Sequence, residues 1–271
     1  MKIELLALDL DGTTMRSNNT LAPEVKVAIE NAIKSGIEVV VASGRPYVSM
    51  PKEILAIEGL RYVIASNGAA IYENGKRIVS DTLQKDDVLK ILELTAEYDM
   101  IWVTFIEGEA CNDKRYYDDP VKYGCGEDYV DYVKNSRGFS SDMRAHILKN
   151  SHRLDSIEFV CKDKTLRENI WKMLENALGE SVYITSSSAN YVEFMNGTAT
   201  KGNAVKKLCE ILKIDIKNTA AAGNADNDVD MIAQAGLGAA VRNASAKCLE
   251  TADVIIPSND DNGIIELFSI I

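Results

Sequence analysis

Uninterrupted runs of apolar residues recur along the chain, and each ends in a short polar or glycine-containing stretch. The first run, 3–8, leads into Asp9, and the second, 37–42, leads into Ser43. Runs without alternation favour parallel strands that are buried on both faces. Further strands are predicted at 61–65, 218–222, 238–241 and 254–256. Because ligands bind beyond the carboxyl ends of such strands, the polar residues there are the first candidates for a site.

Helical periodicity separates these runs. A helix is predicted to begin at Pro23 and to stop at Gly36. Its apolar face consists of Val25, Ala28, Ile29, Ala32 and Ile33. A strand, helix and strand of these lengths form a right-handed unit that brings two parallel strands side by side. Similar units return near the end of the sequence, with a last helix from Gly263. The pattern predicts an α/β fold with a Rossmann-like core built on a parallel sheet.

The alternation of strands and helices is interrupted after the third strand. Asn74-Gly75 lies between the strand-like segments 69–72 and 76–79, and Asn-Gly is a strong signal for a type I′ hairpin.

Residues 82–195 have a different pattern, in which short turns join several of the strands. Strands are predicted at 101–106, 156–161, 182–185 and 191–195, with helices around 88–95 and 166–177. Such a pattern indicates an inserted α+β domain with an antiparallel sheet. We expect a core formed by 1–81 and 196–271 and an inserted domain formed by 82–195. Five tyrosines at 116, 117, 123, 129 and 132 are expected to pack within this insertion, as an alternative to forming a sugar-binding platform.

The amino-acid composition argues against several classes of protein. Hydrophobic residues make up 46% of the 271 residues, and 30 basic against 41 acidic residues give a formal charge of −11. With no basic stripe, binding to nucleic acid is disfavoured. The five cysteines form no CxxC pair, which fits a reducing compartment. No signal peptide or membrane-spanning stretch is recognisable. We therefore expect a cytoplasmic protein without a membrane partner, and the sequence predicts no oligomeric state.

The candidate chemistry starts with two carboxylates, Asp9 and Asp11. If the first strand persists through Asp11, both lie on one face with Cα atoms about 6.5 Å apart. Like charges at that spacing raise each other's pKa, and a hard divalent cation such as Mg²⁺ resolves the conflict. Gly12 permits a sharp turn whose N–H groups form an anion site. The combination indicates a phosphoryl group beside a metal and a carboxylate nucleophile, although it also fits a polar loop that closes a strand.

Three later stretches add to this picture. Ser43 ends the second strand and can contact a phosphate or cap the following helix. Lys201 lies in the first turn of a predicted helix, where the helix dipole disfavours a cation unless an anion is near; a solvated surface lysine is the alternative. The segment 223–228, with the sequence Gly-Asn-Ala-Asp-Asn-Asp, follows another strand. Helix capping explains one of its acidic residues, whereas metal and phosphate binding explain the cluster.

In this order, the four stretches resemble the four motifs of the haloacid dehalogenase superfamily, and in particular its Cof-type phosphatases with a large C2-type cap between the second and third motifs. The stretches are Asp9-Leu10-Asp11-Gly12-Thr13, Ser43-Gly44-Arg45, Lys201-Gly202 and Gly223–Asp228. The resemblance covers essentially the whole chain. It implies a phosphatase core in which the inserted domain selects the substrate.

The resemblance also implies roles for individual residues. Asp9 is implied as the nucleophile that forms an aspartyl-phosphate, and Asp11 as the general acid and base. The implied phosphate contacts are Leu10, Ser43, Gly44, Lys201 and Asn227. The implied Mg²⁺ ligands are Asp9, Asp11, Asn224 and Asp228. Asn224 stands where the family usually has a metal-binding aspartate, so a lower ligand charge and a lower metal affinity are expected.

The expected function is Mg²⁺-dependent hydrolysis of small phosphomonoesters, with sugar phosphates favoured. Alternatives are a phosphomutase, a phosphatase for a phosphorylated disaccharide or glycerate, and a phosphate-sensing module that Asn224 has left weakly active. A dinucleotide fingerprint and a Walker A motif are absent from the sequence. The sequence contains two histidines, His146 and His152, and no GxSxG stretch, so a serine hydrolase triad is not expected.

Overall fold

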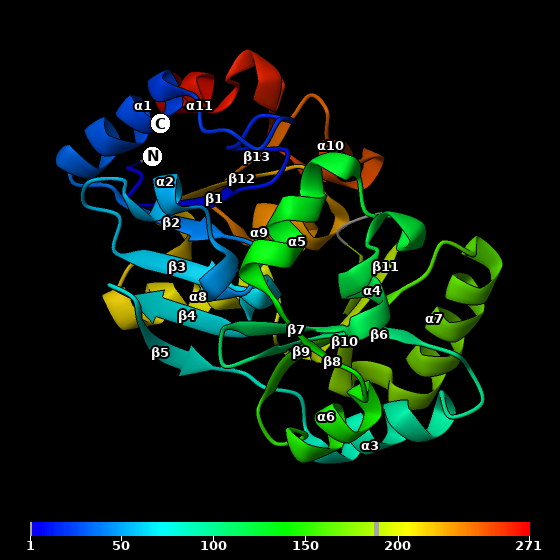
Figure 1. Cartoon of the computed structure of the whole chain (residues 1–271). Coiled ribbons are helices and arrows are strands. Elements are labelled where there is room, and N and C mark those ends of the chain that lie inside the picture. The colour runs from blue at the N-terminus through cyan, green and yellow to red at the C-terminus, as the bar shows by residue number, and fades with distance from the viewer. Residues whose placement is uncertain (1, 187–189) are drawn as a thin grey trace. The chain divides into compact units, whose positions relative to one another are not determined.

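The computed structural model describes residues 2–186 and 190–271, which divide into two compact units. The first unit consists of Met1–Gly44, Met50–Val79 and Thr200–Ile271. The second unit consists of Arg45–Ser49 and Ser80–Ala199. Figure 1 shows the path of the chain through these units, from the blue N-terminus to the red C-terminus.

An eight-stranded sheet forms the centre of the first unit, in the order β14-β13-β12-β1-β2-β3-β4-β5. Its strands are β1 (Leu5–Asp9), β2 (Glu38–Ala42), β3 (Tyr62–Ala65), β4 (Ala70–Glu73), β5 (Lys76–Ser80), β12 (Thr219–Gly223), β13 (Leu237–Val241) and β14 (Val254–Ile256). The six strands from β14 to β3 are parallel, as the apolar runs predicted. The predicted α/β fold with a parallel-sheet core is confirmed.

Strand order reverses direction between β1 and β12. From β1 the chain adds β2 and β3 on one side, and after the second unit it adds β12, β13 and β14 on the other. The carboxyl ends of β1 and β12 therefore flank a topological switch point, where open α/β sheets bind ligands.

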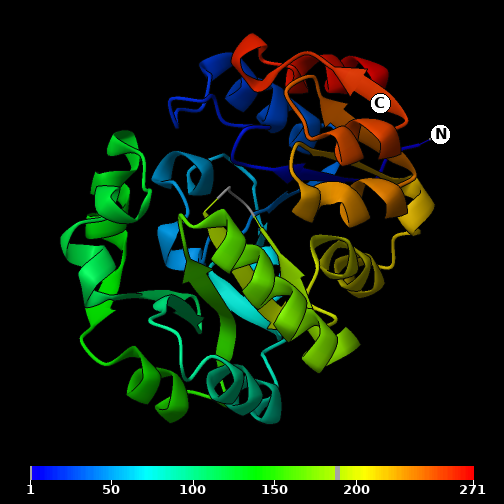
Figure 2. The ribbon, with the colours of Figure 1, turned by 90° about the vertical axis from the view of Figure 1, so that its right-hand side faces the viewer.

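Helices cover both faces of this sheet. They are α1 (Pro23–Lys34), α2 (Lys52–Leu55), α8 (Lys201–Leu212), α9 (Val229–Gln234), α10 (Ala246–Thr251) and α11 (Ile264–Ile270). The core cluster on one face joins Leu5 and Ala7 of β1 to Val205 and Leu208 of α8. On the other face α1 contacts β2 and α11, and the blue and red helices lie side by side in Figures 1 and 2.

The hairpin predicted from Asn74-Gly75 is present between β4 and β5. Asn74 has φ of 48° and Gly75 has φ of 79°. Positive φ at both central residues is the requirement of a type I′ turn, so the structure confirms both the strands and the turn chemistry.

A six-stranded sheet forms the second unit, in the order β10-β11-β9-β6-β7-β8. Its strands are β6 (Ile101–Ile106), β7 (Glu109–Asp113), β8 (Gly138–Ser140), β9 (Leu154–Val160), β10 (Val182–Thr185) and β11 (Tyr191–Asn196). The prediction of an antiparallel sheet is wrong for one pair, because β7 and β8 run parallel. The polar sequence of β7 carries little strand propensity, and pairing with β6 determines its conformation.

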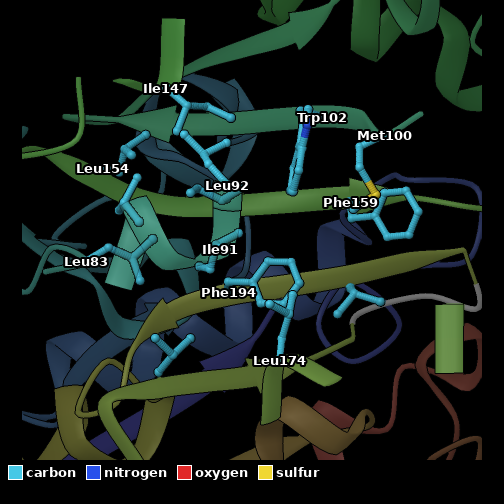
Figure 3. Packing of buried hydrophobic residues seen from close by; sticks show 14 of the residues in the cluster. Leu83, Ile91, Leu92, Met100, Trp102, Ile147, Leu154, Phe159, Leu174 and Phe194 are labelled. Atoms are coloured by element: carbon cyan, nitrogen blue, oxygen red, sulfur yellow. The ribbon is translucent and has the colours of Figure 1, made fainter. Parts of the chain in front are cut away.

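Five helices accompany this sheet in the described residues. They are α3 (Lys85–Leu94), α4 (Lys114–Asp118), α5 (Val130–Ser136), α6 (Met143–Lys149) and α7 (Lys164–Leu178). The main core cluster of the unit combines α3, α6 and α7 with one face of the sheet, including Trp102, Phe159 and Phe194 (Figure 3). Tyr116 is fully buried in a second cluster, and Tyr123 and Tyr132 pack against it, so these three tyrosines pack as predicted.

None of the helices within 2–186 and 190–271 combines the length and the apolar content that crossing a bilayer demands.

Core packing of the second unit can be tested at Leu174, which is fully buried in the cluster of Figure 3. We expect Leu174→Ala to lower the free energy of unfolding by about 2–5 kcal/mol, because it removes buried apolar area and leaves a cavity. Denaturant titration measures the change. Leu89→Ala is the matched control, since Leu89 on α3 is 39% exposed. Equal losses in the two variants would contradict the assignment of this core.

Candidate functional site

Three polar segments of the first unit lie at the carboxyl ends of its parallel strands. Asp9 is the last residue of β1, and Asn224 directly follows β12. Ser43 follows Ala42, which is the register partner of Asp9 on β2. The parallel topology therefore brings together stretches that lie far apart in the sequence.

Asp9 owes its position to the alternation of side chains along β1. Leu5 and Ala7 pack against the face that α8 covers, and Asp9 has the same parity. The N-terminus of α8 lies at that end of the sheet, and its first residue is Lys201. The Nζ atom of Lys201 is 2.6 Å from Oδ1 of Asp9. An anionic side chain therefore lies beside this lysine, and its contact with a phosphate stays a prediction.

The condition that the strand persists through Asp11 is not met, because β1 ends at Asp9. The carbonyl of Leu10 accepts the backbone N–H groups of Thr13, Thr14 and Met15, which turns the chain sharply after Leu10. Gly12 at φ 79° permits this turn, and a Cβ on it would lie 2.5 Å from the Asn224 carboxamide. Asp11 therefore lies on a loop, and its side chain is not aligned with that of Asp9 by strand pleating.

Asp228 is the second partner of Lys201. The Nζ atom of Lys201 lies 2.6 Å from Oδ1 of Asp228, and both side chains are buried. Oδ2 of Asp228 accepts the backbone N–H groups of Asn224 and Ala225, at 2.9 and 3.0 Å. Both carboxylate oxygens thus accept hydrogen bonds from the protein, and Asp228 holds the loop after β12 in place.

Burial shapes the electrostatics of this cluster. Burial and the nearby charge of Asp228 raise the pKa of Asp9 to about 7, while Lys201 opposes the shift. Burial lowers the pKa of Lys201, but Asp228 and Asp9 outweigh it and keep the pKa above its usual range. One cation therefore faces two carboxylates in a site of low dielectric, an arrangement that a further positive charge stabilises.

The Asn224 carboxamide faces three oxygens. One terminal atom of this carboxamide lies 3.1 Å from Oδ2 of Asp9, 3.0 Å from the carbonyl oxygen of Asp11 and 3.1 Å from Oγ1 of Thr13. With the nitrogen at this position, the carboxamide donates hydrogen bonds to the Asp9 and Asp11 oxygens. With the oxygen there, the carboxamide oxygen, Oδ2 of Asp9 and the Asp11 carbonyl oxygen are three acceptors close together, and they require a cation. Adjacent ligands of octahedral Mg²⁺ at about 2.1 Å are about 3.0 Å apart, so these residues fit Mg²⁺.

The donor set differs from an all-carboxylate metal centre. Within the described part of the chain, no group of three or more His, Cys, Asp or Glu side chains is arranged to hold a metal ion. The groups that converge here are one carboxylate, one backbone carbonyl and one carboxamide. These groups carry less negative charge than they would with an aspartate at 224, and the lower metal affinity expected from that difference stays a prediction.

The structure adds residues that sequence reasoning did not select. Asn67 is buried and adopts φ of 54°, and its Oδ1 accepts the side-chain N–H of Asn227 at 2.8 Å. Its backbone N–H donates to the carbonyl of Ser43. Thr13 contacts Asn224, as described above. The position of Ser66-Asn67-Gly68 directly after β3 was the available signal, because β3 ends at the same edge of the sheet.

The role of the Lys201 charge between Asp9 and Asp228 can be tested by measuring the stability of a variant. We expect Lys201→Met to lower the free energy of unfolding by about 3–5 kcal/mol at neutral pH, because two buried carboxylates lose their counter-charge. In the variant the pKa of Asp9 lies further above its unfolded value, so stability is retained at acidic pH and lost as pH rises. Denaturant titration across pH measures this.

Lys206→Met is the control for that variant, since Lys206 is exposed on the same helix. A loss of stability in Lys201→Met that does not change with pH would contradict the electrostatic explanation.

Comparison with known proteins agrees with the geometry. The model of the haloacid dehalogenase-like hydrolase family matches residues 6–268. Phosphatase YwpJ of Bacillus subtilis is 27% identical over 98% of each chain. A 5-amino-6-(5-phospho-D-ribitylamino)uracil phosphatase of the same organism, YcsE, is 25% identical over 97% of this chain and 93% of its own.

Solved structures give the same result. A haloacid dehalogenase-like hydrolase from B. subtilis superposes with a TM-score of 0.84 at 26% identity, covering 98% of this chain and 99% of the other. The family match spans nearly the whole sequence, and the related proteins are phosphatases. The chain therefore belongs to the haloacid dehalogenase-like hydrolase family, as a phosphatase of that family.

Proposed function

We propose that the chain hydrolyses small phosphomonoesters in a Mg²⁺-dependent reaction, with polyol and sugar phosphates as the substrate class. The observation that carries this proposal is the placement of Lys201 Nζ 2.6 Å from the carboxylate of Asp9, at the switch point of the sheet. A buried carboxylate beside a fixed cation is suited to attack on an anionic phosphoryl group. The related phosphatase that acts on a phosphorylated ribityl chain supports the substrate class.

In the proposed reaction, a carboxylate oxygen of Asp9 attacks the phosphorus atom in line with the ester bond. The ester P–O bond breaks, and Asp11 donates a proton to the leaving alcohol. The product of this half-reaction is an aspartyl-phosphate on Asp9. Asp11, now ionised, removes a proton from a water molecule that attacks the phosphorus. Inorganic phosphate leaves and the Asp9 carboxylate is restored.

Other residues hold the phosphoryl group. Lys201 balances its charge together with that of Asp9. We assign the remaining contacts to the backbone of Leu10, to Ser43 and Gly44 after β2, and to Asn227. The hydrogen bond of Asn227 to Asn67 fixes the orientation of its amide, which supports a positioning role for Asn67. Without added positive charge, a phosphate dianion about 4 Å from Asp9 meets several kcal/mol of repulsion at an effective dielectric constant near 20.

Asp9, the carbonyl of Asp11 and Asn224 are the proposed Mg²⁺ ligands. When bound, Mg²⁺ neutralises part of the charge that the nucleophile and the phosphate share. Asp228 was predicted as a further ligand. Because both of its oxygens accept hydrogen bonds from Lys201 and from the loop after β12, we propose that it supports the metal site by positioning Asn224.

The second unit is proposed as the substrate-selecting cap of this core. Cytoplasmic location is also a proposal, which the free cysteines at 111, 125, 161, 209 and 248 support, since unpaired thiols suit a reducing compartment.

The proposed nucleophile is tested by phosphate release from a panel of esters, with Mg²⁺ or with chelator. We expect wild-type protein to release phosphate only with Mg²⁺, and Asp9→Asn to lose at least about 10³-fold in kcat, because an amide cannot form the phosphoenzyme. Asp86→Asn, an exposed substitution on α3, is the control and should retain full activity. Undiminished activity of Asp9→Asn would rule out the assignment.

The metal ligand is tested at Asn224. We expect Asn224→Asp to lower the Kd for Mg²⁺ by about tenfold or more, because a charged oxygen replaces a neutral one. Without metal the same variant should melt at a lower temperature than wild type, since another carboxylate joins Asp9 and Asp228. Titration calorimetry and melting curves measure both effects. Asn31→Asp, on the exposed side of α1, is the control, and unchanged Mg²⁺ affinity in Asn224→Asp would contradict the ligand assignment.

Asn224 also favours a second candidate function, a phosphate-binding regulatory module with little turnover. In that case wild-type protein binds inorganic phosphate in calorimetry and releases none from any ester, and Asn224→Asp gains activity. Formation of an isomerised ester instead of free phosphate would indicate a phosphomutase.

A further inference from the structure

The loop after β1, residues 10–17, carries Asp11 and lies outside the helices and strands. It turns sharply at Leu10, as described above, and an isolated β-bridge pairs Asp11 with Met15. The pleat of a strand fixes the direction of a side chain, and a loop lacks that constraint. The position of the Asp11 carboxyl group therefore depends on the contacts that hold this loop.

Asn243 contacts the loop from the end of another strand. It follows β13, and its Nδ2 donates to the carbonyl oxygen of Gly12 at 2.9 Å. Its Oδ1 accepts the backbone N–H of Asn259 at 3.2 Å. A donor is needed on one side and an acceptor on the other, so the two backbone groups together fix the orientation of this carboxamide. One side chain thus joins the residue next to Asp11 to the C-terminal part of the chain.

Asn259 holds the other end of the loop. Its side chain is buried, and its Nδ2 donates to the carbonyl oxygen of Met15 at 3.0 Å. Because Met15 forms the β-bridge with Asp11, this hydrogen bond constrains the backbone of both residues. A buried carboxamide is costly compared with an apolar side chain unless it is hydrogen-bonded. The contact with the loop accounts for an amide at this buried position.

The segment 259–262 makes further contacts with the same loop. The two carboxylate oxygens of Asp260 accept the backbone N–H and the hydroxyl of Ser17, at 2.9 and 2.8 Å. Oδ1 of Asn262 accepts hydrogen bonds from the guanidinium of Arg16. Three consecutive residues of the loop, 15–17, are therefore attached to one short segment near the C-terminus.

The stretch after β13 also contacts the loop that follows β12. The backbone N–H of Ser245 donates to the carbonyl oxygen of Asn224 at 2.7 Å. Asn243 and Ser245 thus bind two different strand-end loops, one with Asp11 and one with Asn224. These contacts hold the two loops in one arrangement beside the Asp9 carboxylate.

We propose that Asn243 and Asn259 are positioning residues, which keep the carboxyl group of Asp11 within reach of the leaving-group oxygen. The proposal rests on the acid–base role of Asp11 in the function proposed above. A general acid donates its proton effectively only within hydrogen-bond distance of the acceptor, about 2.6–3.2 Å. A displacement of about 1 Å can lower a rate about 100-fold. Both asparagines act through the backbone of the loop that carries Asp11.

The acidity of the leaving group separates this role from a structural one. p-Nitrophenolate leaves as a stable anion, so its release needs no proton from Asp11, whereas phenyl phosphate reacts slowly unless the leaving oxygen is protonated. The ratio kcat/KM reports the steps up to the phosphoenzyme, before Asp11 acts as a base. A displaced Asp11 therefore lowers kcat/KM for the poor leaving group selectively. Damage to the fold or to the phosphate contacts lowers it for both esters.

We expect Asn243→Ala and Asn259→Ala to lower kcat/KM for phenyl phosphate about 10- to 100-fold, and for p-nitrophenyl phosphate less than about threefold. With p-nitrophenyl phosphate both variants should give a burst of p-nitrophenolate and then a slow steady rate, because a displaced Asp11 activates water poorly. Asp11→Asn should show the same pattern more strongly. Asn31→Ala, exposed on α1, is the matched control. Equal losses with both esters would overturn the proposal.

Amide hydrogen exchange, measured by mass spectrometry, separates this proposal from the proposed activity. We expect faster exchange of residues 10–17 in Asn243→Ala than in wild type, with unchanged exchange in α1. Unchanged exchange in 10–17 would overturn the positioning role, whatever the activity. If Asp11→Asn shows no dependence on the leaving group, the acid–base step of the proposed function fails, and faster exchange in Asn243→Ala then still supports Asn243 as the residue that holds the loop. Should Asn259→Ala fail to fold, Asn243→Ala decides, because Asn243 is exposed.

Discussion

The site depends on one buried ammonium that two carboxylates share. Asp9 ends β1, Asp228 lies in the short helical turn that follows β12, and Lys201 joins them from the N-terminus of α8. A lysine in the first turn opposes the helix dipole, and it is stable there because two anions outweigh the dipole. This interaction fixes the nucleophile, the helix and the loop after β12 in one arrangement.

Much of the fold could be predicted from the sequence because apolar runs and helical periodicity agree with the final topology. The runs at 3–8 and 37–42 became β1 and β2, and Asn74-Gly75 formed the expected turn. Pairing of Asp9 with Ala42 followed from the parallel connection. The site residues at the strand ends were accessible to prediction for the same reason.

Other features depend on tertiary contacts that leave little trace in the sequence. The strand β7 is polar, and its residue Asn112 is buried because β7 pairs with β6. Glu158 looked like an ordinary strand residue, because its facing partner Glu193 lies 35 positions later. The end of β1 at Asp9, in place of Asp11, follows from three N–H groups converging on one carbonyl of Leu10.

The contact between Lys201 and Asp9 spans 192 positions of sequence. Closure of so long a loop is slow compared with local helix and hairpin formation, so we expect this ion pair to form late in folding. During synthesis, the first strands leave the ribosome long before α8 and β12 exist, and the carboxylate of Asp9 then has no lysine partner. The order of segments in the chain therefore delays assembly of the reactive centre until Lys201 and Asp228 have been made.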